Sequence, residues 1–453
     1  MSPTREQLEQ WDRDHLWHPF TPMQVYAAEK PVIIERAHGC FLVDLDGNEY
    51  IDGVSSLWCN VHGHRVPELD DAVRAQLERV AHTTLLGLAN VPAIQLARRL
   101  VELAPPGLTR VFYSDDGATA VEVALKMAFQ FWRQCPEPKP GKTKFLALKS
   151  AYHGDTLGDV SVGDVARFHH LFAPLLFPTL RAPNHYCYRC PLGLERSRCR
   201  IDCVEELARL VRDHADELAA VVVEPLVQGA AGMITAPAGY LRRVRDVTQE
   251  HDVLLIADEV AVGCGRTGTL FACSQEGVSP DFLCLAKGLT GGYLPLAATL
   301  TTERVYAAFL GRPEEGRTFY HGHTYTGNPL GAAVALANLD LLTRPGFLAA
   351  LSEKIERLAQ QLERIATLPH VGEVRQRGLM AGIELVADRA TKQPFPPERR
   401  MGAQVCRAAR EQGVMLRPLG DVVVVMPPLA IDISLLERLG EVLYNCLARL
   451  PGV

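Results

Sequence analysis

The sequence predicts an α/β protein with a large, mostly parallel sheet and a smaller α+β domain. Two observations carry this prediction. Between about residues 66 and 335, helical patterns alternate with short apolar runs, which is typical of a parallel sheet covered by helices. Beyond about residue 331, a long helical pattern precedes several strand-like segments and one more helix. The 453 residues, of which 47% are apolar, are enough to build two such cores.

The N-terminal part of the chain is expected to be an arm that joins the smaller domain. Residues 17–22 contain two prolines and resist regular structure, so the arm looks irregular up to about Arg36. Residues 41–53 predict a β-hairpin with its turn at Asp46-Gly47 or Gly47-Asn48. The expected boundaries are residues 1–65 for the arm and part of the small domain, 66–335 for the large domain, and 336–453 for the C-terminal small domain.

Short apolar runs mark the expected strands. Ligands in open α/β sheets bind outside the carboxyl ends of the strands, so polar side chains that follow these runs are candidates for a site. The expected strands of the large sheet are residues 110–114, 144–148, 220–224, 253–258, 282–286 and 297–301, and those of the small domain are residues 378–384, 414–417 and 422–426.

Charge and hydropathy argue against several classes of partner. The net charge is −6 and the Lys and Arg residues are scattered, so neither nucleic acid nor an anionic membrane surface is expected as a partner. The N-terminus is polar and unlike a signal peptide, and no apolar run approaches the roughly 20 residues that span a bilayer. We therefore expect a cytoplasmic protein.

Two strand ends carry charged residues that point to one chemistry. Lys287 ends the apolar run 280–286, and Asp258 with Glu259 ends the run 254–257. A strand-end lysine usually reaches solvent, whereas a buried amine is costly unless it is neutral or covalently used. A lysine that forms a Schiff base and a carboxylate that holds a pyridinium nitrogen are the two anchors of a pyridoxal phosphate site. The pair therefore predicts pyridoxal 5′-phosphate as the cofactor.

Two loops after neighbouring strands extend this predicted site. Gly117 and Ala118 open a helical pattern, where free backbone amides favour a phosphate, although an ordinary capped turn has the same pattern. The loop at residues 150–156 contains Tyr152, which can stack on a cofactor ring, and Asp155, which can meet a substrate amine. For this loop the alternative is an ordinary polar turn.

One further polar residue is a candidate for the same site, and two other motifs suggest different ligands. Glu224 places a further carboxylate at a strand end. His321 and His323 lie in a polar loop without a cluster of carboxylates or cysteines, so a metal is not expected there. Residues 263–268 match a dinucleotide-binding turn, but no long helix follows, and no acid ends a second strand at the usual distance. An NAD enzyme is therefore the runner-up.

Four of the twelve cysteines gather in one segment, as Cys187-x2-Cys190-x8-Cys199-x3-Cys203. This spacing permits a tetrahedral structural zinc site. The second spacing is looser than in paired knuckles, however, so a cysteine-bearing surface loop is the favoured interpretation and no metal is expected. Most other cysteines lie singly in apolar contexts, where buried free thiols are usual.

Together these motifs resemble the class III, or omega-type, pyridoxal phosphate aminotransferases over nearly the whole chain. Residues 254–260, the glycine turn at residues 263–268 and Lys287 carry the resemblance. It implies the type I fold of pyridoxal phosphate-dependent transferases, with a seven-stranded sheet, and a homodimer with active sites at the interface. It also explains the glycine turn as a loop of that family.

Within that family, the chain resembles the branch that converts 8-amino-7-oxononanoate to 7,8-diaminononanoate in biotin biosynthesis. That branch usually takes the amino group from S-adenosylmethionine, in ping-pong steps through pyridoxamine phosphate. The segments that carry this narrower resemblance are residues 17–23, 52–58, 152–156, 256–260, 416–418 and 426–428.

The resemblance also implies roles for individual residues. Lys287 would bond to the cofactor and then move a proton as general base and acid, and Asp258 would hold the pyridinium nitrogen. Tyr152 would stack on the ring. The remaining positions are Gly117, Ala118 and Glu224 beside the cofactor, Thr324 on the phosphate of the cofactor in the partner subunit, and Trp58, Asp155, Phe20 and Arg417 around the substrate, with Arg417 paired to its carboxylate.

Three positions depart from the family pattern. Phe20 and Val424 stand where a tyrosine is frequent, and Leu57 replaces the first member of a Trp-Trp pair. Because these positions shape the donor pocket, lysine is an alternative donor, and residues 81–87 resemble the branch that uses it. Another omega-aminotransferase acting on a diamine or an ω-amino acid is a further alternative. A catalytically silent relative acting as a scaffold is disfavoured, since both charged anchors are present.

Overall fold

The chain folds around a seven-stranded sheet, which the computed structural model describes together with the rest of residues 3–450. The strand order is β4-β12-β11-β10-β7-β5-β6, and every pair is parallel except the two that involve β12. The mostly parallel α/β fold expected from the sequence is therefore confirmed. The strands are β4 (Leu108–Ser114), β5 (Lys144–Leu148), β6 (Thr179–Ala182), β7 (Leu218–Val223), β10 (Leu254–Asp258), β11 (Phe282–Leu285) and β12 (Ala297–Thr302).

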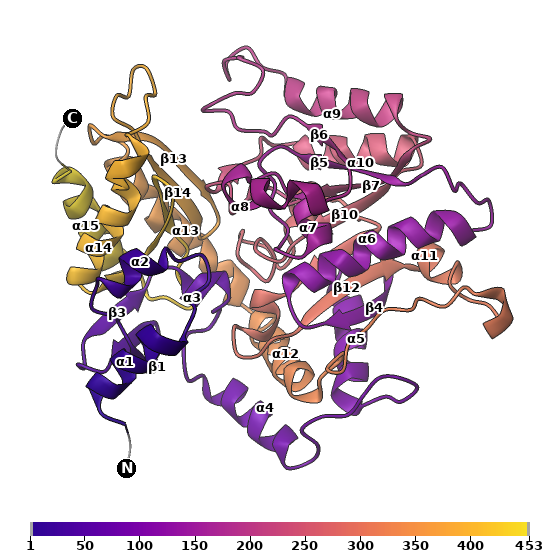
Figure 1. Cartoon of the computed structure of the whole chain (residues 1–453), viewed down its shortest axis with the longest axis horizontal. Helices are drawn as coiled ribbons and strands as arrows, with labels where there is room; N and C mark the ends of the chain where they lie inside the picture. The colour runs from indigo at the N-terminus through magenta and orange to yellow at the C-terminus, as the bar shows by residue number, and fades with distance from the viewer. Residues whose placement is uncertain (1–2, 451–453) are drawn as a thin grey trace.

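The sheet is buried on both faces because alternate residues of its central strands enter different cores. In β10, Leu255 and Ala257 belong to one apolar cluster, whereas Leu254 and Ile256 belong to another. Helix α6 packs on the second face and four other helices pack on the first (Figure 1). Burial on both faces explains why these strands are continuous apolar runs without alternation. The helices are α6 (Gly117–Gln134) on one side and α5 (Val91–Leu103), α9 (Asp202–Asp213), α10 (Tyr240–Glu250) and α12 (Pro329–Leu342) on the other, with α4 (Pro67–Leu77) packed on α12.

Two further four-stranded sheets contain the segments expected in the small domain. One of them joins the N-terminal hairpin to the C-terminal part, because Ile51 lies opposite Val414 in a parallel pair. The hairpin is confirmed, with Phe41 opposite Ile51. In Figure 1 the indigo N-terminal segment lies beside the yellow C-terminal helices. The boundaries near residues 65 and 335 stay a prediction. The elements are β1 (Ile34–His38), β2 (Phe41–Asp44), β3 (Glu49–Asp52), β15 (Val414–Met415), β13 (Val371–Arg377), β14 (Met380–Leu385), β17 (Val422–Val425), β16 (Arg417–Leu419), α13 (Phe347–Ile365), α14 (Met401–Glu411) and α15 (Ile433–Ala448).

The N-terminal arm is more regular than expected. Helix α1 (Arg5–His15) forms the first part of the arm. The prediction of an irregular arm up to about Arg36 was therefore wrong for these residues. The Thr4 hydroxyl accepts a hydrogen bond from the Gln7 backbone amide at 3.3 Å, and the Gln7 side chain accepts one from the Thr4 amide at 2.9 Å. This reciprocal capping box was the missed signal. Residues 17–22 hold neither helix nor strand, as expected, and α2 (Met23–Ala27) follows.

Several strands were not predicted, among them β1, β6 and β13. Strand β6 is a four-residue edge strand whose side chains are mostly half-buried, and β13 mixes charged with apolar residues, so neither has a strong apolar run. The remaining short elements are α3 (Ser55–Trp58), α7 (Leu157–Val162), α8 (Ala166–His169), α11 (Glu303–Ala307), β8 (Val227–Gln228) and β9 (Ile234–Thr235), with 3-10 turns at η1 (His170–Leu175), η2 (Ala272–Glu276), η3 (Lys287–Thr290), η4 (Pro313–Glu315) and η5 (Pro397–Arg399).

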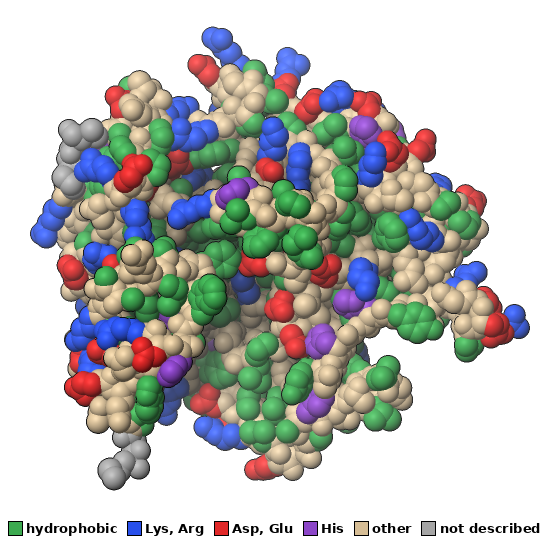
Figure 2. Space-filling view, in the orientation of Figure 1, with side chains coloured by type: hydrophobic (Ala, Val, Ile, Leu, Met, Phe, Trp, Pro, Cys, Tyr) green, Lys and Arg blue, Asp and Glu red, His purple; other side chains and the backbone are tan. Residues whose placement is uncertain are grey.

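Acidic and basic side chains lie side by side over the face in Figure 2. Within residues 3–450, no single helix is long and apolar enough to cross a bilayer, and α12 and α13 pass such a test only as a pair bent by 72°.

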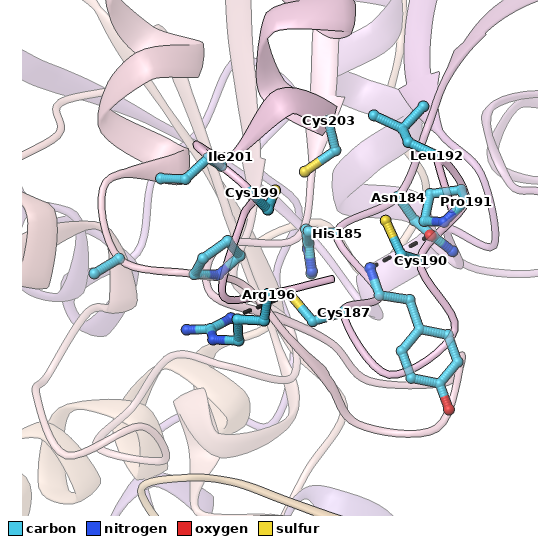
Figure 3. A pocket seen from close by; sticks show the side chains of 13 residues that line it. Asn184, His185, Cys187, Cys190, Pro191, Leu192, Arg196, Cys199, Ile201 and Cys203 are labelled. Atoms are coloured by element: carbon cyan, nitrogen blue, oxygen red, sulfur yellow. Dashed lines mark hydrogen bonds between the residues drawn. The ribbon is translucent and has the colours of Figure 1, made fainter. Parts of the chain in front are cut away.

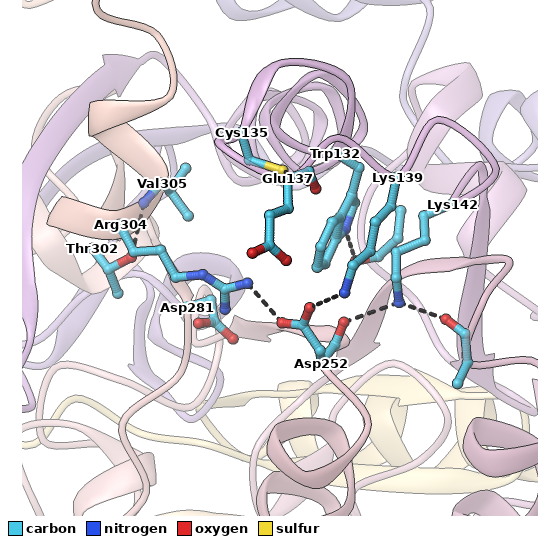
Figure 4. A network of polar contacts seen from close by, with 12 residues as sticks. Trp132, Cys135, Glu137, Lys139, Lys142, Asp252, Asp281, Thr302, Arg304 and Val305 are labelled. Carbon is cyan, nitrogen blue, oxygen red and sulfur yellow. Dashed lines mark hydrogen bonds and ion pairs between the residues drawn. The ribbon is translucent and has the colours of Figure 1, made fainter.

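A polar network closes the amino end of the sheet (Figure 4). Buried Lys142 lies under the Trp132 ring, 4.6 Å from its centroid, and donates to three backbone carbonyl oxygens, among them that of Asp252 at 2.9 Å. The Asp252 carboxylate accepts hydrogen bonds from Lys139 and Arg304, both at 2.6 Å. This end of the sheet is therefore occupied by groups that satisfy one another.

Candidate active site

The structure places Asp258 and Lys287 at the carboxyl ends of neighbouring parallel strands. Asp258 ends β10 opposite Cys284 of β11, and Lys287 follows β11 at the start of a 3-10 turn. The turn is held by buried Asn338, whose side chain donates to the carbonyl oxygens of Gly288 and Leu289, both at 2.9 Å. Lys287 has a positive φ of 46°, a conformation that costs energy for a residue with a side chain. Both predicted anchors therefore lie at one edge of the sheet.

Burial sets the electrostatics of the lysine. Removal of the amine from water lowers the pKa of Lys287, while the carboxylates of Asp258 and Glu224 act in the opposite direction. A lowered pKa leaves more of the amine neutral, which is the form that attacks a carbonyl group and accepts a proton. Among the described residues, none accepts a hydrogen bond from the Lys287 Nζ atom.

His153 braces the carboxylate of Asp258. Its Nδ1 atom lies 2.8 Å from Oδ2 of Asp258, and both side chains are buried. The other carboxylate oxygen of Asp258 accepts a hydrogen bond from the Val260 amide at 3.0 Å. These contacts hold the carboxylate in one orientation. No role was predicted for His153, although it directly follows Tyr152 in the same motif.

Glu224 connects the next strand to the same edge. It follows β7 and accepts hydrogen bonds from the Gly229 amide at 2.8 Å and the Tyr152 amide at 3.4 Å. Burial, together with the charge of Asp258, raises the pKa of Glu224 to about 7, against the opposing effects of His153 and of the two backbone hydrogen bonds. Glu224 therefore positions the backbone of the Tyr152 loop as well as adding a carboxyl group to the site.

Tyr152 and Phe20 belong to one aromatic group. The Tyr152 hydroxyl donates to Oδ2 of exposed Asp155 at 2.8 Å, and burial raises the pKa of that phenol. The Phe168 ring lies 6.2 Å from the Tyr152 ring and 5.2 Å from the Phe20 ring, centroid to centroid. The arm residue Phe20 thus reaches the site through Phe168, a residue without a predicted role.

The first turn of α6 lies directly beside the residues that follow β10. A Cβ atom at Gly117 would lie 2.5 Å from a methyl group of Val260, so a larger residue does not fit without movement. Ala118 packs in the same way on Gly154, where an added Cβ would lie 2.4 Å from the Ala118 methyl group. The helix is capped by Asp116, which accepts from the Thr119 amide at 2.9 Å. The first amides of α6 remain free for an anion.

The ring of Trp58 covers the amine of Lys287. The amine lies 5.2 Å from the centroid of the Trp58 ring, and the indole Nε1 is buried without a partner in the described part of the chain. Four consecutive residues, Ser55 to Trp58, have positive φ values of 51°, 56°, 121° and 69°. Asp52 holds this strained turn by accepting hydrogen bonds from the Ser56 amide at 2.8 Å and hydroxyl at 2.7 Å. Such strain is characteristic of functional sites.

Arg417 and Thr324 are less closely tied to these residues. Arg417 begins β16, paired with Val424 of β17, and it forms no ion pair within residues 3–450. Thr324 lies exposed in the loop before α12. No hydrogen bond or ion pair joins either residue to the rest of the predicted site in the part of the chain that the structure describes.

The glycine turn at residues 263–268 ties the site to the C-terminal part. The 3-10 turn η2, rather than a long helix, follows it. Buried Arg266 donates to Ser55 Oγ and to the Asn60 carbonyl oxygen, both at 3.2 Å, and to the Pro427 carbonyl oxygen. The turn therefore positions the strained Trp58 segment, and the geometry gives no support to an NAD site.

These residues fit pyridoxal phosphate. At the carboxyl end of the sheet, Lys287 has a lowered pKa and the Asp258 carboxylate is held by His153. Helix α6 begins nearby with free amides, and the Trp58 indole N–H has no partner among the described residues. The lysine can bond to the aldehyde of the cofactor, the carboxylate suits its pyridine nitrogen, and the free amides suit its phosphate.

Comparisons with known proteins agree with this geometry. The family model described as aminotransferase class III matches residues 23–447. An adenosylmethionine-8-amino-7-oxononanoate aminotransferase from Geobacter sulfurreducens is 54% identical over 98% of both chains, and one of the same name from Nitratidesulfovibrio vulgaris is 57% identical over 95% of this chain and 80% of its own.

Solved structures show the same similarity in three dimensions. A crystal structure of the Methanocaldococcus jannaschii protein of that name has a TM-score of 0.93 at 44% identity, covering 98% of this chain and 99% of that one. A PLP-bound amine transaminase from an uncultivated Pseudomonas species has a TM-score of 0.90 at 36% identity, covering 96% of this chain and 99% of that one. The chain belongs to the class III aminotransferases, and it is a pyridoxal phosphate-dependent transaminase.

Proposed function

We propose that this transaminase converts 8-amino-7-oxononanoate to 7,8-diaminononanoate in biotin biosynthesis, with S-adenosylmethionine as amino donor. The observation that carries the proposal is the shared name of relatives that match nearly the whole chain. The site residues also support it, because the chain has a residue suited to each task of the reaction: moving the proton, holding the cofactor and binding the substrate.

Lys287 is proposed as the residue that moves the proton. Pyridoxal phosphate, when bound, supplies an electron sink for the charge left when a substrate carbon loses its proton. The Lys287 amine, whose pKa burial lowers, would accept that proton on Nζ and later donate it again. Asp258, oriented by His153, would hold the ring nitrogen of the cofactor in its protonated form. Trp58 excludes water from one side of the amine.

The phosphate is proposed to lie at the first turn of α6, on the amides of Gly117 and Ala118. Thr324 is proposed to reach the phosphate of the cofactor in a second copy of the chain. Its exposed position in a loop outside the site is consistent with that role. We therefore also propose a cytoplasmic homodimer in which each active site contains residues of both subunits.

Arg417 is proposed to bind the carboxylate of the keto substrate. Its guanidinium group has no ion-pair partner in residues 3–450, so it is available for a bidentate contact. Tyr152 would stack on the cofactor ring, and Asp155 would meet the substrate amine. Phe20 and Trp58 would line the pocket between them.

The donor is tested by single half-reactions. The holoenzyme is mixed separately with S-adenosylmethionine, lysine, a simple diamine and β-alanine, and loss of the near-visible cofactor band is followed. We expect S-adenosylmethionine to bleach the band and 8-amino-7-oxononanoate to restore it. Bleaching by lysine alone would replace the donor but keep the acceptor. Bleaching by β-alanine alone would contradict the assignment to biotin biosynthesis.

The acceptor is tested at Arg417. Arg417→Ala is expected to lower kcat/KM for 8-amino-7-oxononanoate by about 10- to 100-fold, the value of a charged hydrogen bond, with little change in the donor half-reaction. Arg417→Lys keeps the charge without the bidentate fork and should lie between the two. Equal losses in both half-reactions would show that Arg417 does not select the acceptor.

A second candidate is another omega-aminotransferase that acts on a diamine or an ω-amino acid. Phe20 and Leu57 favour it, because they remove a hydroxyl and an indole from the donor pocket. The amine transaminase structure at 36% identity is also consistent with it. The diamine and β-alanine arms of the same experiment decide between the two.

A further inference from the structure

A buried histidine lies beside the predicted active site. His169 ends α8 and is 5% exposed, and neither of its ring nitrogens has a partner among the described residues. In that part of the chain it is the only histidine whose two ring nitrogens are both buried and unpartnered. Because buried polar groups are nearly always hydrogen-bonded, a histidine in this state is costly unless it serves a purpose.

A second buried histidine has no such connection to the active site. His185 lies in the loop before α9 and lines a cavity of about 250 Å³, and its ring packs on that of Tyr240 with the centroids 5.0 Å apart (Figure 3). Within residues 3–450, no three His, Cys, Asp or Glu side chains are arranged to hold a metal ion, so the cysteines of this cavity form no metal site. They are Cys187, Cys190, Cys199 and Cys203.

The His169 ring lies against Tyr152, the residue proposed to stack on the cofactor. The two rings are nearly parallel, at 16°, and their centroids are 6.0 Å apart. Phe168 meets the tyrosine edge-on, at 81°, with the centroids 6.2 Å apart. Ring pairs at such distances add stabilisation beyond the area that they bury. His169 and Phe168 thus support the tyrosine ring, whereas Asp155 and Glu224 hold its hydroxyl and its backbone amide.

Gly163 leaves room for the His169 ring. A Cβ atom at Gly163 would lie 2.7 Å from Cε1 of His169, and 3.1 Å from both its Nδ1 atom and the Asp159 carbonyl oxygen. The Arg181 guanidinium holds the backbone here by donating to the carbonyl oxygens of Gly163 and Ser161, both at 2.7 Å. Gly163 is extended, with φ −78° and ψ 157°, a conformation open to any residue. A side chain at this position would therefore chiefly disturb the histidine ring.

The imidazole of His169 is neutral at neutral pH. Burial lowers its pKa, Asp155 and Asp164 act to raise it, and Arg181 and His153 act to lower it further. A neutral ring can pack on an aromatic neighbour, whereas a charged ring without an acceptor is driven out of the cluster. The support of the tyrosine should therefore be complete above about pH 6.5, the ordinary pKa of histidine, and weaken as the pH falls below it.

From these contacts we propose that His169 is a positioning residue of this transaminase. Its ring, packed on Gly163, holds Tyr152 in the orientation that stacks on the cofactor. The inference rests on the proposed role of Tyr152 and deepens it. Phe168 also connects this group to Phe20 of the arm, with the ring centroids 5.2 Å apart, so the support extends toward the proposed donor pocket.

Cofactor binding to the purified apoenzyme tests the proposal before any donor or acceptor is added. His169→Ala is expected to raise the dissociation constant of pyridoxal phosphate about 5- to 10-fold, the value of one aromatic contact. The near-visible absorbance and circular dichroism of the bound cofactor should change as well. His169→Phe keeps a flat ring and should restore both. The matched control is His170→Ala, which removes the exposed histidine next in the chain and should behave as the wild type.

Two double variants separate positioning from simple packing. His169→Ala should cause no further loss of affinity in a Tyr152→Ala background, because the histidine acts through the tyrosine. Gly163→Ala should weaken binding in the wild type by displacing the ring. It should have little effect together with His169→Ala, which leaves space for the new methyl group. If His169→Ala does not fold, Gly163→Ala with and without Tyr152→Ala makes the same test, and thermal unfolding of each apoenzyme shows which variants are folded.

The dependence on pH adds a readout that a loss of packing does not change. Below about pH 6.5, the affinity of the wild type for the cofactor should fall more steeply than that of His169→Phe. Wild-type affinity in His169→Ala, or equal losses with and without Tyr152, would overturn the role of His169 and leave the proposed function standing. Unchanged affinity in Tyr152→Ala would overturn the role of the tyrosine and this inference together.

Discussion

The two ends of the large sheet each hold a lysine, and its surroundings differ: Lys142 is buried and Lys287 is half-buried. At the amino end, Lys142 donates to three backbone carbonyl oxygens, and burial lowers its pKa to about 8. At the carboxyl end, burial also lowers the pKa of Lys287, but no described residue accepts a hydrogen bond from its amine. The lowered pKa is therefore common to both lysines. The free hydrogen-bonding capacity of Lys287 is what separates a reactive amine from a structural one.

Strain separates the two ends in the same way. Lys287 and the segment from Ser55 to Trp58 have positive φ values, whereas Lys142 is held by ordinary hydrogen bonds (Figure 4). Strain and unsatisfied groups persist only where the surrounding fold enforces them. The strained carboxyl end thus lowers the stability of the fold at the site of the chemistry, whereas the hydrogen bonds at the amino end stabilise the fold.

Lys287→Ala should have the largest effect. We expect kcat to fall by at least about 10³-fold, since covalent attachment and proton transfer are both lost. Stability of the apoenzyme should not fall, because the amine that is removed donates no hydrogen bond to any described residue. Stopped-flow half-reactions and thermal unfolding measure the two effects. The matched control is Lys149→Ala, a strand-end lysine that is exposed after β5. Near-normal turnover in Lys287→Ala would refute the assignment.

Asp258→Asn comes next. The variant keeps the size of the side chain but removes its charge, so it cannot hold a protonated ring nitrogen. We expect kcat to fall by about 10²- to 10³-fold, the scale of losing one preorganised electrostatic contact. Substituting a cofactor analogue that carries a permanent charge on the ring nitrogen should restore part of the rate. A loss of less than tenfold would count against this role.

Lys142→Met, at the amino end, is expected to have the opposite effects to Lys287→Ala: lower stability and unchanged turnover. Three buried carbonyl oxygens lose their donor, so the free energy of unfolding should fall by about 2 kcal/mol. The kcat of the folded enzyme should stay unchanged. Chemical denaturation and steady-state kinetics check both. A large fall in kcat with unchanged stability would erase the distinction between the two lysines.

Glu224→Gln probes the cost of burying charge at the carboxyl end. The folded pKa of Glu224 is raised to about 7, so ionisation destabilises the fold. Below about pH 4 both states carry the proton and this group contributes nothing, whereas stability falls as the pH rises from there through 7. The variant should flatten this fall by about 1–3 kcal/mol in the apoenzyme. An unchanged slope of Tm against pH would show that Glu224 is not the group responsible.

Phe20→Tyr should have the smallest effect. It adds one hydroxyl to the arm beside the Phe168 and Tyr152 rings, worth about 1 kcal/mol, so the donor KM should change by less than about tenfold. Stability should not change. Phe172→Tyr, an exposed phenylalanine nearby, is the matched control. A change in kcat for both half-reactions would place Phe20 in the catalytic machinery rather than in the donor pocket.

Most of the large sheet was predictable because its strands are buried on both faces. Each of the six expected strands is present within about two residues, since continuous apolar runs leave few alternatives. The edge strand β6 could not be predicted because it is half-buried and has no continuous apolar run. Helix α1 could not be predicted from apolar spacing because its start is marked by a local cap.

The sequence by itself determined the family, the parallel sheet and the positions of Lys287 and Asp258, because strand ends and their charged residues are adjacent in the chain. Only the tertiary structure decided that His153 braces Asp258, that Trp58 covers the amine, and that four cysteines share one cavity. The physical reason is the same in each case. Side chains from distant segments meet only when the sheet brings their loops to one edge, and neither their hydrogen bonds nor their burial is encoded in local spacing.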